Sequence, residues 1–260
     1  MVPTYALAGN HDMPGDSQSE WAVSALGCLP AAPGFVPVES VSVPPGGIAY
    51  MAYTHSVDKF LAAAREAAAH PSRPRTLVCH GEIDGAKYDN GHPAPGGVDP
   101  ALIPFDFVIS GHYHTRQAFG NVDYPGTARW DTQSDANQEK GIWVYEHSDD
   151  GAPVSKKFVS TAGVCVPILE LEWREGQAMP AAPAGSRTTY SLVGSSAWVG
   201  GAKKEASASG ATTRSTFTDS AAGREGRRKS AGLGDYLAST FEPVAGVERR
   251  EIAGWLGIAP

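Results

Sequence analysis

The sequence predicts an α/β fold in which apolar strands end on polar residues at one edge of a sheet. Apolar runs at 2–8, 75–80 and 105–114 have the composition of short buried strands, and amphipathic segments lie between the first two. Such alternation favours an α/β sandwich. In these sheets functional side chains gather where strands end, so the residues after each strand are the first candidates for a site.

Composition and charge exclude several function classes. The 260 residues are 42% hydrophobic and 19% charged, which suits one large globular domain or a domain with an appendage. Residues 1–184 carry 11 Lys and Arg against 21 Asp and Glu, and such an acidic body binds nucleic acid poorly without metal ions or a partner. The chain shows neither a basic leader nor an apolar run of about 18 residues, so we expect a cytoplasmic protein.

Helical and strand periodicities predict the remaining elements. Residues 16–29 and 57–70 have helical spacing; the second segment places Phe60, Leu61, Ala64 and Ala67 on one face and stops at Pro71. A strand is expected at 48–53, followed by strands 75–80 and 105–114. From residue 121 the chain predicts antiparallel strands at 121–131, 141–147, 156–161 and 166–173. We therefore expect one domain over 1–175.

The C-terminal third changes in composition. Residues 176–232 are rich in Gly, Ala, Ser, Thr and Pro, which predicts a flexible, disordered linker. Residues 233–260 regain apolar side chains in two short helical stretches. These helices either bind a partner or pack back on the domain, and their position after a flexible tether favours a partner.

Four polar residues follow apolar strands and are candidate metal ligands. Asn10, His80, His112 and His114 would meet at one edge of a parallel sheet, and an Asn carbonyl with imidazoles suits Mn, Fe or Zn. His112 and His114 are two residues apart, so extended backbone places them on the same side. His11 is not needed as a ligand and would face the substrate. The alternative is that each histidine has a structural role.

Three stretches in this order, "AGNHD", "CHGEIDGAKY" and "FDFVISGHYHT", resemble the later motifs of the calcineurin-like metallophosphoesterases. With "YPGTARWD" and "KGIWVYE", the likeness covers roughly residues 2–147 and is closest to the SbcD-type DNA nucleases. It implies a metallophosphoesterase-type β-sandwich flanked by helices. It also implies two divalent ions, Mn by preference.

The resemblance implies a role for each matching residue. Asn10, His80 and His112 would bind one ion, His114 would bind the other, and His11 would stabilise or protonate the reacting phosphodiester. The "YPGTARWD" stretch lies near the site in these nucleases, so Tyr124 and Arg129 are expected near the substrate.

The implied function is a metal-dependent phosphodiester hydrolase, the nuclease subunit of an SbcCD-like complex for DNA end processing, repair and recombination. Its partners would be DNA, a second copy of the chain, and an SbcC-like coiled-coil ATPase held by residues 233–260. Two alternatives remain. One is a calcineurin-like phosphoesterase acting on small phosphodiesters or phosphoproteins, and the other is a non-catalytic remnant or scaffold.

The departure from the family pattern concerns the first metal ligands. The pattern begins with Asp-x-His and Gly-Asp-x-x-Asp, but no Asp in this chain is followed by x-His, and "GDSQSE" at 15–20 comes after Asn10 and ends in Glu. We therefore expect a fold without its first two strands, as in a truncated reading frame, half of a split protein or a diverged subunit. Such a chain should bind at most one metal ion tightly and have little or no nuclease activity.

Overall fold

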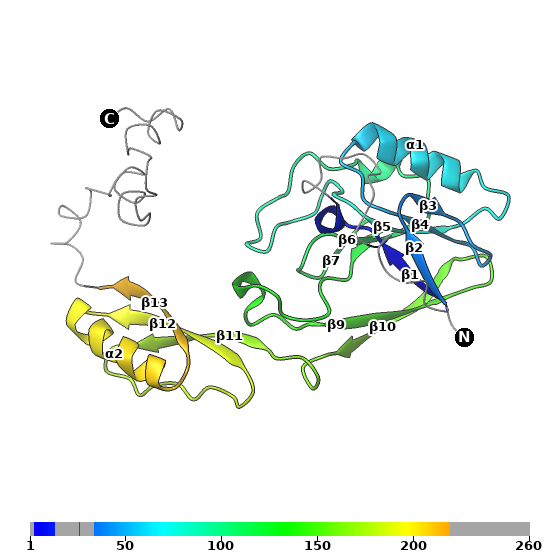
Figure 1. The fold of residues 1–260 in the computed structure, drawn as a ribbon. Helices are drawn as coiled ribbons and strands as arrows, with labels where there is room; N and C mark the ends of the chain where they lie inside the picture. The colour runs from blue at the N-terminus through cyan, green and yellow to red at the C-terminus, as the bar shows by residue number, and fades with distance from the viewer. Residues whose placement is uncertain (1–2, 14–25, 27–33, 219–260) are drawn as a thin grey trace, which may run out of the picture. The chain divides into compact units, whose positions relative to one another are not determined.

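The structure is a computed structural model that describes residues 3–13, 26 and 34–218 and divides the chain into two compact units (Figure 1). The first unit comprises Met1–Glu170 and Ala182–Thr188, and the second comprises Leu171–Ala181 and Thr189–Pro260. The predicted mixed α/β architecture is confirmed. The helix predicted at 16–29 lies outside the described residues, apart from Leu26.

A six-stranded sheet forms the centre of the first unit, in the order β3-β4-β5-β6-β8-β7. Its strands are β3 (Val41–Ser42), β4 (Ile48–Met51), β5 (Thr76–His80), β6 (Phe107–Gly111), β7 (Gln117–Phe119) and β8 (Val122–Tyr124). The four inner strands pair in parallel, and β3 and β7 pair antiparallel at the two edges. The parallel strands therefore deliver their C-terminal residues to one edge.

Helix α1 (Val57–Ala68) packs on this sheet through the four residues that its spacing predicts: Phe60, Leu61, Ala64 and Ala67. It begins where the Ser56 hydroxyl accepts a hydrogen bond from Lys59 N at 3.3 Å, and it ends before Pro71. Its apolar face joins Leu77 and Val108 in the main core. Among the described residues, no helix has the length and apolar character needed to cross a membrane.

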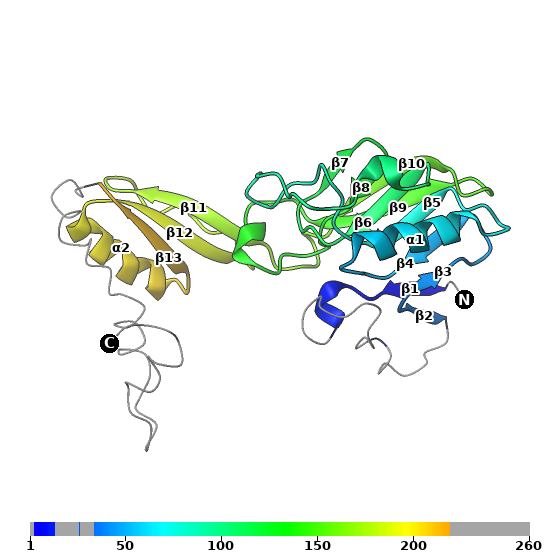
Figure 2. The same cartoon turned by 90° about the horizontal axis from the view of Figure 1, so that it is seen from above.

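A parallel pair, β1 (Thr4–Leu7) and β2 (Phe35–Val38), adjoins the end of β4 (Figure 2). Ala8 N donates to Val38 O at 3.0 Å, and Tyr53 N donates to Ala8 O at 2.8 Å. These bonds fix the residues that follow β1 beside the end of the six-stranded sheet. Strand β1 therefore presents Asn10 at the edge where β5 and β6 end.

An antiparallel hairpin, β9 (Gly141–His147) and β10 (Pro153–Ser160), lies across the sheet from α1 in Figure 1. The buried carboxylate of Asp123 in β8 accepts hydrogen bonds from Tyr145 (3.1 Å) and Lys156 (2.6 Å) of the hairpin. The hairpin is thus attached to the sheet by a polar anchor, because a buried carboxylate is costly unless its oxygens are paired.

The second unit corrects the predicted linker at 176–232. Within that range the chain forms β12 (Arg187–Gly194), α2 (Ser196–Ala208) and β13 (Thr212–Phe217), and β12 lies between β11 (Ile168–Arg174) and β13. Strands β12 and β13 are parallel and α2 crosses between them. Residues 219–232 and the predicted helical segment 233–260 lie outside the described residues.

Small residues in this stretch fill a packed core instead of loosening the chain. Trp173 contacts Tyr190 and Trp198 edge to face, with ring centroids 5.9 and 5.4 Å apart, and Ala202 and Ala206 of α2 are buried beside them. Trp173, inside the domain expected over 1–175, therefore belongs to the core of the second unit. Composition misled here because alanines permit close helix packing, which composition alone does not distinguish from a linker.

We expect the backbone amides of Tyr190 and Leu192 to exchange with solvent at least about 1,000-fold more slowly than in an unstructured peptide, because β12 is the central strand of its sheet. Hydrogen exchange followed by mass spectrometry on the whole chain measures this. Exchange at the random-coil rate would restore the linker interpretation.

Candidate metal centre

The register of β5 and β6 brings two of the predicted histidines together. His80, the last residue of β5, pairs with Gly111, the last residue of β6, so His112 follows directly beside it. The two imidazole centroids lie 5.4 Å apart with the rings at 90°. Parallel pairing without a register shift is sufficient to produce this neighbourhood.

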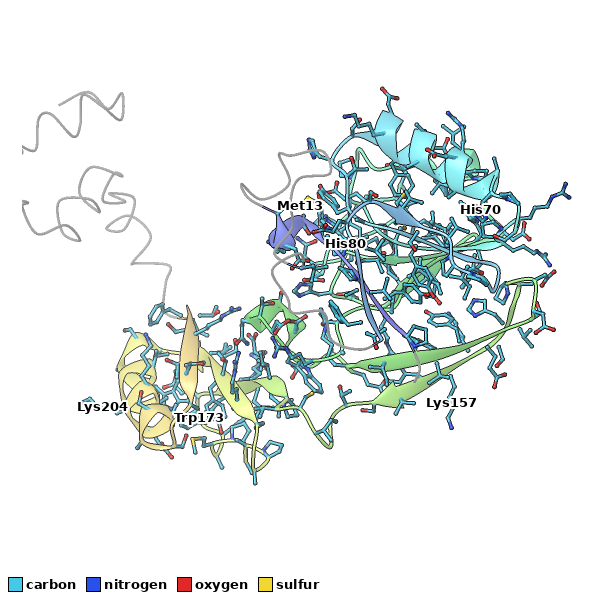
Figure 3. The ribbon with its side chains drawn as sticks, turned by 45° about the vertical axis from the view of Figure 1, so that its right-hand side comes forward. Met13, His70, His80, Lys157, Trp173 and Lys204 are labelled. Carbon is cyan, nitrogen blue, oxygen red and sulfur yellow. The ribbon has the colours of Figure 1, made fainter. Side chains whose placement is uncertain are left out.

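Asn10 completes the group from β1. It begins the short 3-10 helix η1 (Asn10–Asp12), and its Oδ1 lies 3.1 Å from His80 Nε2. Ligands that each lie about 2.0–2.2 Å from one ion are about 3 Å from one another. The ligand atoms of Asn10 and His80 are therefore close enough to share one ion, and the His112 ring stands next to His80. Figure 3 labels His80 beside Met13, at the end of the fold away from His70.

Two glycines make room for the His80 ring. A Cβ atom at Gly9 would lie 3.0 Å from His80 Cε1, and one at Gly111 would lie 2.9 Å from His80 Nδ1. Neither glycine has a left-handed φ, so close approach is what requires the missing side chain. The ring is held between two backbone segments.

His112 adopts a backbone conformation that suits a constrained site. Its φ is +106°, which a residue with a side chain rarely adopts and which costs of order 1–3 kcal/mol. Its Nε2 lies 3.2 Å from Glu82 Oε1, and its ring stacks on Tyr53. Its Nδ1 is buried and has no hydrogen-bond partner among the described residues. A buried unpaired nitrogen is costly, and metal ligation would satisfy it.

The electrostatics keep these imidazoles neutral. Burial, together with the nearby His112, lowers the pKa of His80 to about 4, and burial also lowers the pKa of His112 although Glu82 opposes the shift. The neutral ring is the form that binds a metal. At pH 7 both histidines are therefore ready to act as ligands without losing a proton.

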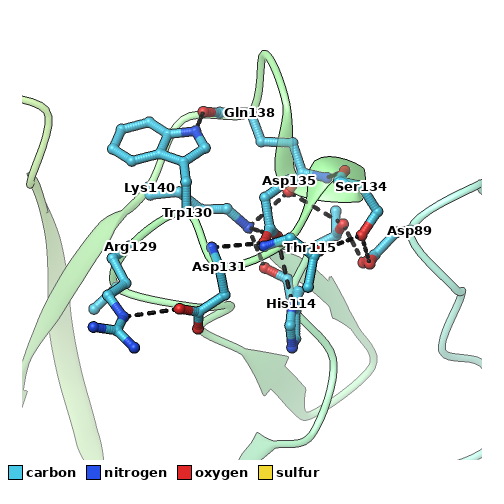
Figure 4. Close-up of polar contacts among 12 residues, drawn as sticks. Asp89, His114, Thr115, Arg129, Trp130, Asp131, Ser134, Asp135, Gln138 and Lys140 are labelled. Carbon is cyan, nitrogen blue, oxygen red and sulfur yellow. Dashed lines mark hydrogen bonds and ion pairs between the residues drawn. The ribbon is translucent and has the colours of Figure 1, made fainter. Parts of the chain in front are cut away.

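His114, which was expected beside the other three predicted ligands, lies in a second group drawn in Figure 4. The expectation of extended backbone from His112 to His114 is wrong, because β6 ends at Gly111 and His112 has a left-handed φ. Asp89, His114 and Asp135 each offer a ligand atom, and these atoms lie within 4.8 Å of one another, a spacing that could hold a metal ion. His112 and His114 both line one hollow of about 300 Å³, so the two groups open onto the same space.

Asp135 and Lys140 form a buried ion pair behind His114. Asp135 Oδ1 accepts from Lys140 Nζ at 2.7 Å, and both side chains are essentially inaccessible. Lys140 also donates to His114 O and to Gln138 Oε1, each at 2.9 Å, so all three ammonium protons have acceptors. The pair attaches the His114 backbone to the loop that carries Asp135.

Both carboxylate oxygens of Asp135 already accept hydrogen bonds. Burial alone would raise its pKa, but hydrogen bonds from Lys140 and from the backbone N–H groups of Thr132 and Asp131 outweigh burial and lower it to about 2. Asp135 Oδ1 also lies 3.4 Å from His114 Nδ1. This contact is not a hydrogen bond, because His114 Nδ1 is buried without a hydrogen-bond partner among the described residues. As at His112, metal ligation would satisfy this nitrogen.

Asp89 is freer to change partners than Asp135. Within the described part of the chain its two oxygens accept hydroxyl protons, from Thr115 at 2.8 Å and Ser134 at 3.1 Å, and its side chain is exposed. Hydroxyl groups can rotate to another acceptor, so Asp89 and His114 are the ligands that this second group can offer most easily.

The remaining predicted residues lie in different environments. His11 is exposed directly after Asn10. Arg129 is exposed and pairs with Asp131 at 2.9 Å. Tyr124, predicted near the substrate, is fully buried: its hydroxyl donates to Gly81 O at 2.9 Å and accepts from Ile83 N at 3.0 Å. The prediction for Tyr124 is wrong, because this side chain fixes the loop after His80.

Sequence reasoning missed four residues of this centre: Glu82, Asp89, Asp135 and Lys140. Glu82 stands two positions after His80, a spacing that could have indicated it. Asp135 and Lys140 carry no comparable local signal, since they are surrounded by other polar residues.

No protein-family model matches the chain, and no curated protein matches its sequence.

The strain at His112 can be measured with two substitutions. His112→Gly and His112→Ala both remove the imidazole, but only glycine adopts a φ of +106° without steric cost. We expect the glycine variant to have the larger free energy of unfolding, by about 1 kcal/mol after its greater unfolded-state entropy is allowed for. Urea denaturation measures the difference, and an alanine variant of equal or greater stability would contradict it.

The lowered pKa of His80 predicts a pH dependence of stability in metal-free protein. The unfolded chain binds a proton near pH 6.5, whereas folded His80 does so only at about 4. The contribution is therefore complete above about pH 6.5 and is lost as the pH falls toward 4, by up to about 3 kcal/mol.

Urea denaturation with a chelator at pH 7.5 and pH 4.5 tests this dependence. His80→Asn should lose less stability than the wild type between these values. His70→Asn, in which the replaced side chain is exposed and contacts Ser72, serves as the matched control. An equal loss in His80→Asn would show that other groups cause the dependence.

Proposed function

We propose that the chain is a metal-dependent phosphodiester hydrolase of the metallophosphoesterase type, acting on DNA. The observation that supports it most directly is the convergence of Asn10, His80 and His112 where three strands end, beside a hollow that His112 and His114 line. A carboxamide oxygen with neutral imidazoles is a donor set suited to Mn, Fe or Zn, and we propose Mn.

Asn10, His80 and His112 would hold the tightly bound ion, and the unpaired Nδ1 of His112 fits this role. Such an ion supplies Lewis-acid stabilisation of the phosphate and lowers the pKa of water. His114, with Asp89 beside it, would provide a weaker second position.

The chain's own residues would complete the reaction around the phosphate. His11 is exposed next to Asn10, where its ring can donate a proton to the leaving oxygen. Glu82, 3.2 Å from His112 Nε2, would orient the His112 ring, and Lys140 holds the His114 backbone through its carbonyl. Imidazoles held in fixed positions reduce the reorganisation that the reaction requires.

The proposed biological setting is a DNA end-processing complex that also contains a second copy of this chain and a coiled-coil ATPase. The ATPase would bind residues 233–260, which lie outside the described residues. A role on DNA is consistent with the acidic body only if metal ions or that partner bring the substrate to the site.

A non-catalytic role is the alternative that the geometry favours most. Asp135 is committed to Lys140, so the second group has fewer available carboxylates than its composition suggests. A chain that holds a single ion would bind a phosphate but activate and clamp it less well than a two-ion site.

The test uses the purified chain with Mn²⁺ and compares cleavage of linear duplex DNA with that of bis(p-nitrophenyl) phosphate. We expect only slow DNA cleavage by the wild type, because a site with one tight ion activates the phosphate weakly. His80→Asn should lower that rate at least about 100-fold further, because a ligand contributes at least as much as the residues behind it. His70→Asn should retain the wild-type rate. Calorimetric titration with Mn²⁺ should show one tight equivalent.

Each other outcome selects a different function. Cleavage of the aryl ester without DNA cleavage would indicate a small-phosphodiester enzyme. One bound Mn²⁺ without any hydrolysis would indicate a scaffold. Unchanged DNA cleavage in His80→Asn would contradict the proposed metal centre itself.

A further inference from the structure

The hollow beside the metal centre has an aromatic wall. His112 and His114 line it together with Tyr88, Asp89, Asn90 and Tyr113. Its volume of about 300 Å³ is at the small end of ligand clefts, enough for one planar ring and its attachment. One space therefore presents two imidazoles of the proposed metal centre and an aromatic side chain.

Tyr88 is exposed, yet its backbone is fixed. The residue is 48% exposed. The preceding residue, Lys87, is held by the Gln117 side chain, which accepts from Lys87 N at 2.8 Å and donates to Lys87 O at 2.9 Å. Tyr88 N donates to His92 O at 2.9 Å, and Tyr88 O accepts from Gly91 N at 2.8 Å. An exposed aromatic ring on a fixed loop is the arrangement that a binding site needs.

The Tyr88 ring is also connected to the centre through other rings. It meets Tyr113 edge to face, with centroids 6.1 Å apart, and Tyr113 meets His112 with centroids 5.0 Å apart. Tyr113 is buried, so it supports Tyr88 from behind. The exposed part of Tyr88 is therefore presented toward the space that a substrate attached to the metal centre would enter.

We propose that Tyr88 stacks on a nucleobase next to the phosphodiester that is cleaved. The inference depends on the proposed function and adds the substrate group that this wall recognises. Nucleotides are phosphodiesters that carry a planar aromatic ring, and such rings stack on exposed tyrosines without regard to sequence. Asn90, on the same wall, offers an amide group to the edge of a base.

The test compares two esters with the same leaving group, thymidine 5′-(p-nitrophenyl phosphate) and methyl p-nitrophenyl phosphate, with the full chain and Mn²⁺. The readout is the ratio of their kcat/KM values. We expect Tyr88→Ala to lower this ratio about 5- to 100-fold, the range that the loss of one stacked base produces. Tyr88→Phe should keep the ratio, because phenylalanine preserves the stacking face.

Leu102→Ala is the matched control, since Leu102 is 49% exposed and does not line the hollow. It should hydrolyse both esters as the wild type does. An unchanged ratio of the two kcat/KM values in Tyr88→Ala would overturn the proposal. If both esters were slowed equally, Tyr88 would have a structural role.

A binding measurement separates this proposal from the proposed hydrolysis. Single-stranded oligonucleotides and a mononucleotide that contain 2-aminopurine, mixed with the chain and Ca²⁺, should lose fluorescence when the base stacks on Tyr88. We expect quenching by the wild type and by Tyr88→Phe, but not by Tyr88→Ala.

The outcomes separate the two proposals. If the chain cleaves neither ester but quenches in this pattern, only the hydrolase proposal fails. Equal quenching by Tyr88→Ala overturns the stacking proposal. Quenching of the mononucleotide would show that one nucleotide is enough for binding beside Tyr88. Quenching of the oligonucleotide alone would show that binding there requires a longer single strand.

Discussion

The parallel pairing of β5 with β6 is the constraint on which the rest of the centre depends. It sets His80 opposite Gly111, and the absence of a side chain at Gly111 lets the His80 ring lie against that backbone. The chain then turns at His112 with a left-handed φ, which points the second imidazole to the same place. A slip of one residue between β5 and β6 would place the His80 and His112 rings on opposite faces of the sheet and remove the site.

The second constraint is electrostatic, and it concerns what lies behind His114. Lys140 is a buried cation whose three protons are all accepted, one of them by the His114 carbonyl. A buried ion pair of this kind adds little net stability, because desolvation offsets most of the attraction. Its contribution is geometric. Moving either partner would leave an unpaired charge in the interior, so Lys140 holds the His114 backbone and Asp135 at a fixed separation.

As a result of these two constraints, the centre contains rigid, partly buried ligands and, around them, exposed side chains. His80 and His112 are partly buried, neutral and tightly packed, whereas His11, Asp89 and Tyr88 are exposed around the same region. Rigid neutral imidazoles suit a bound ion, since no proton has to be removed and no ring has to move. Exposed groups suit contact with a substrate, because their partners can exchange when it arrives.

Local pattern determined much of this protein from the sequence. The helical spacing of Phe60, Leu61, Ala64 and Ala67 predicted α1 and its buried face. The positions after apolar strands predicted a meeting of four residues, of which Asn10, His80 and His112 lie together and His114 lies with Asp89 and Asp135. Only the tertiary structure decided that Tyr124 is buried, that Asp135 and Lys140 stand behind His114, and that 187–217 fold into β12, α2 and β13. The physical reason is how far apart in the sequence the interacting residues lie. Periodicity and strand ends are properties of neighbouring residues, whereas burial, ion pairing and the close packing of alanines depend on segments that meet only after the chain has folded.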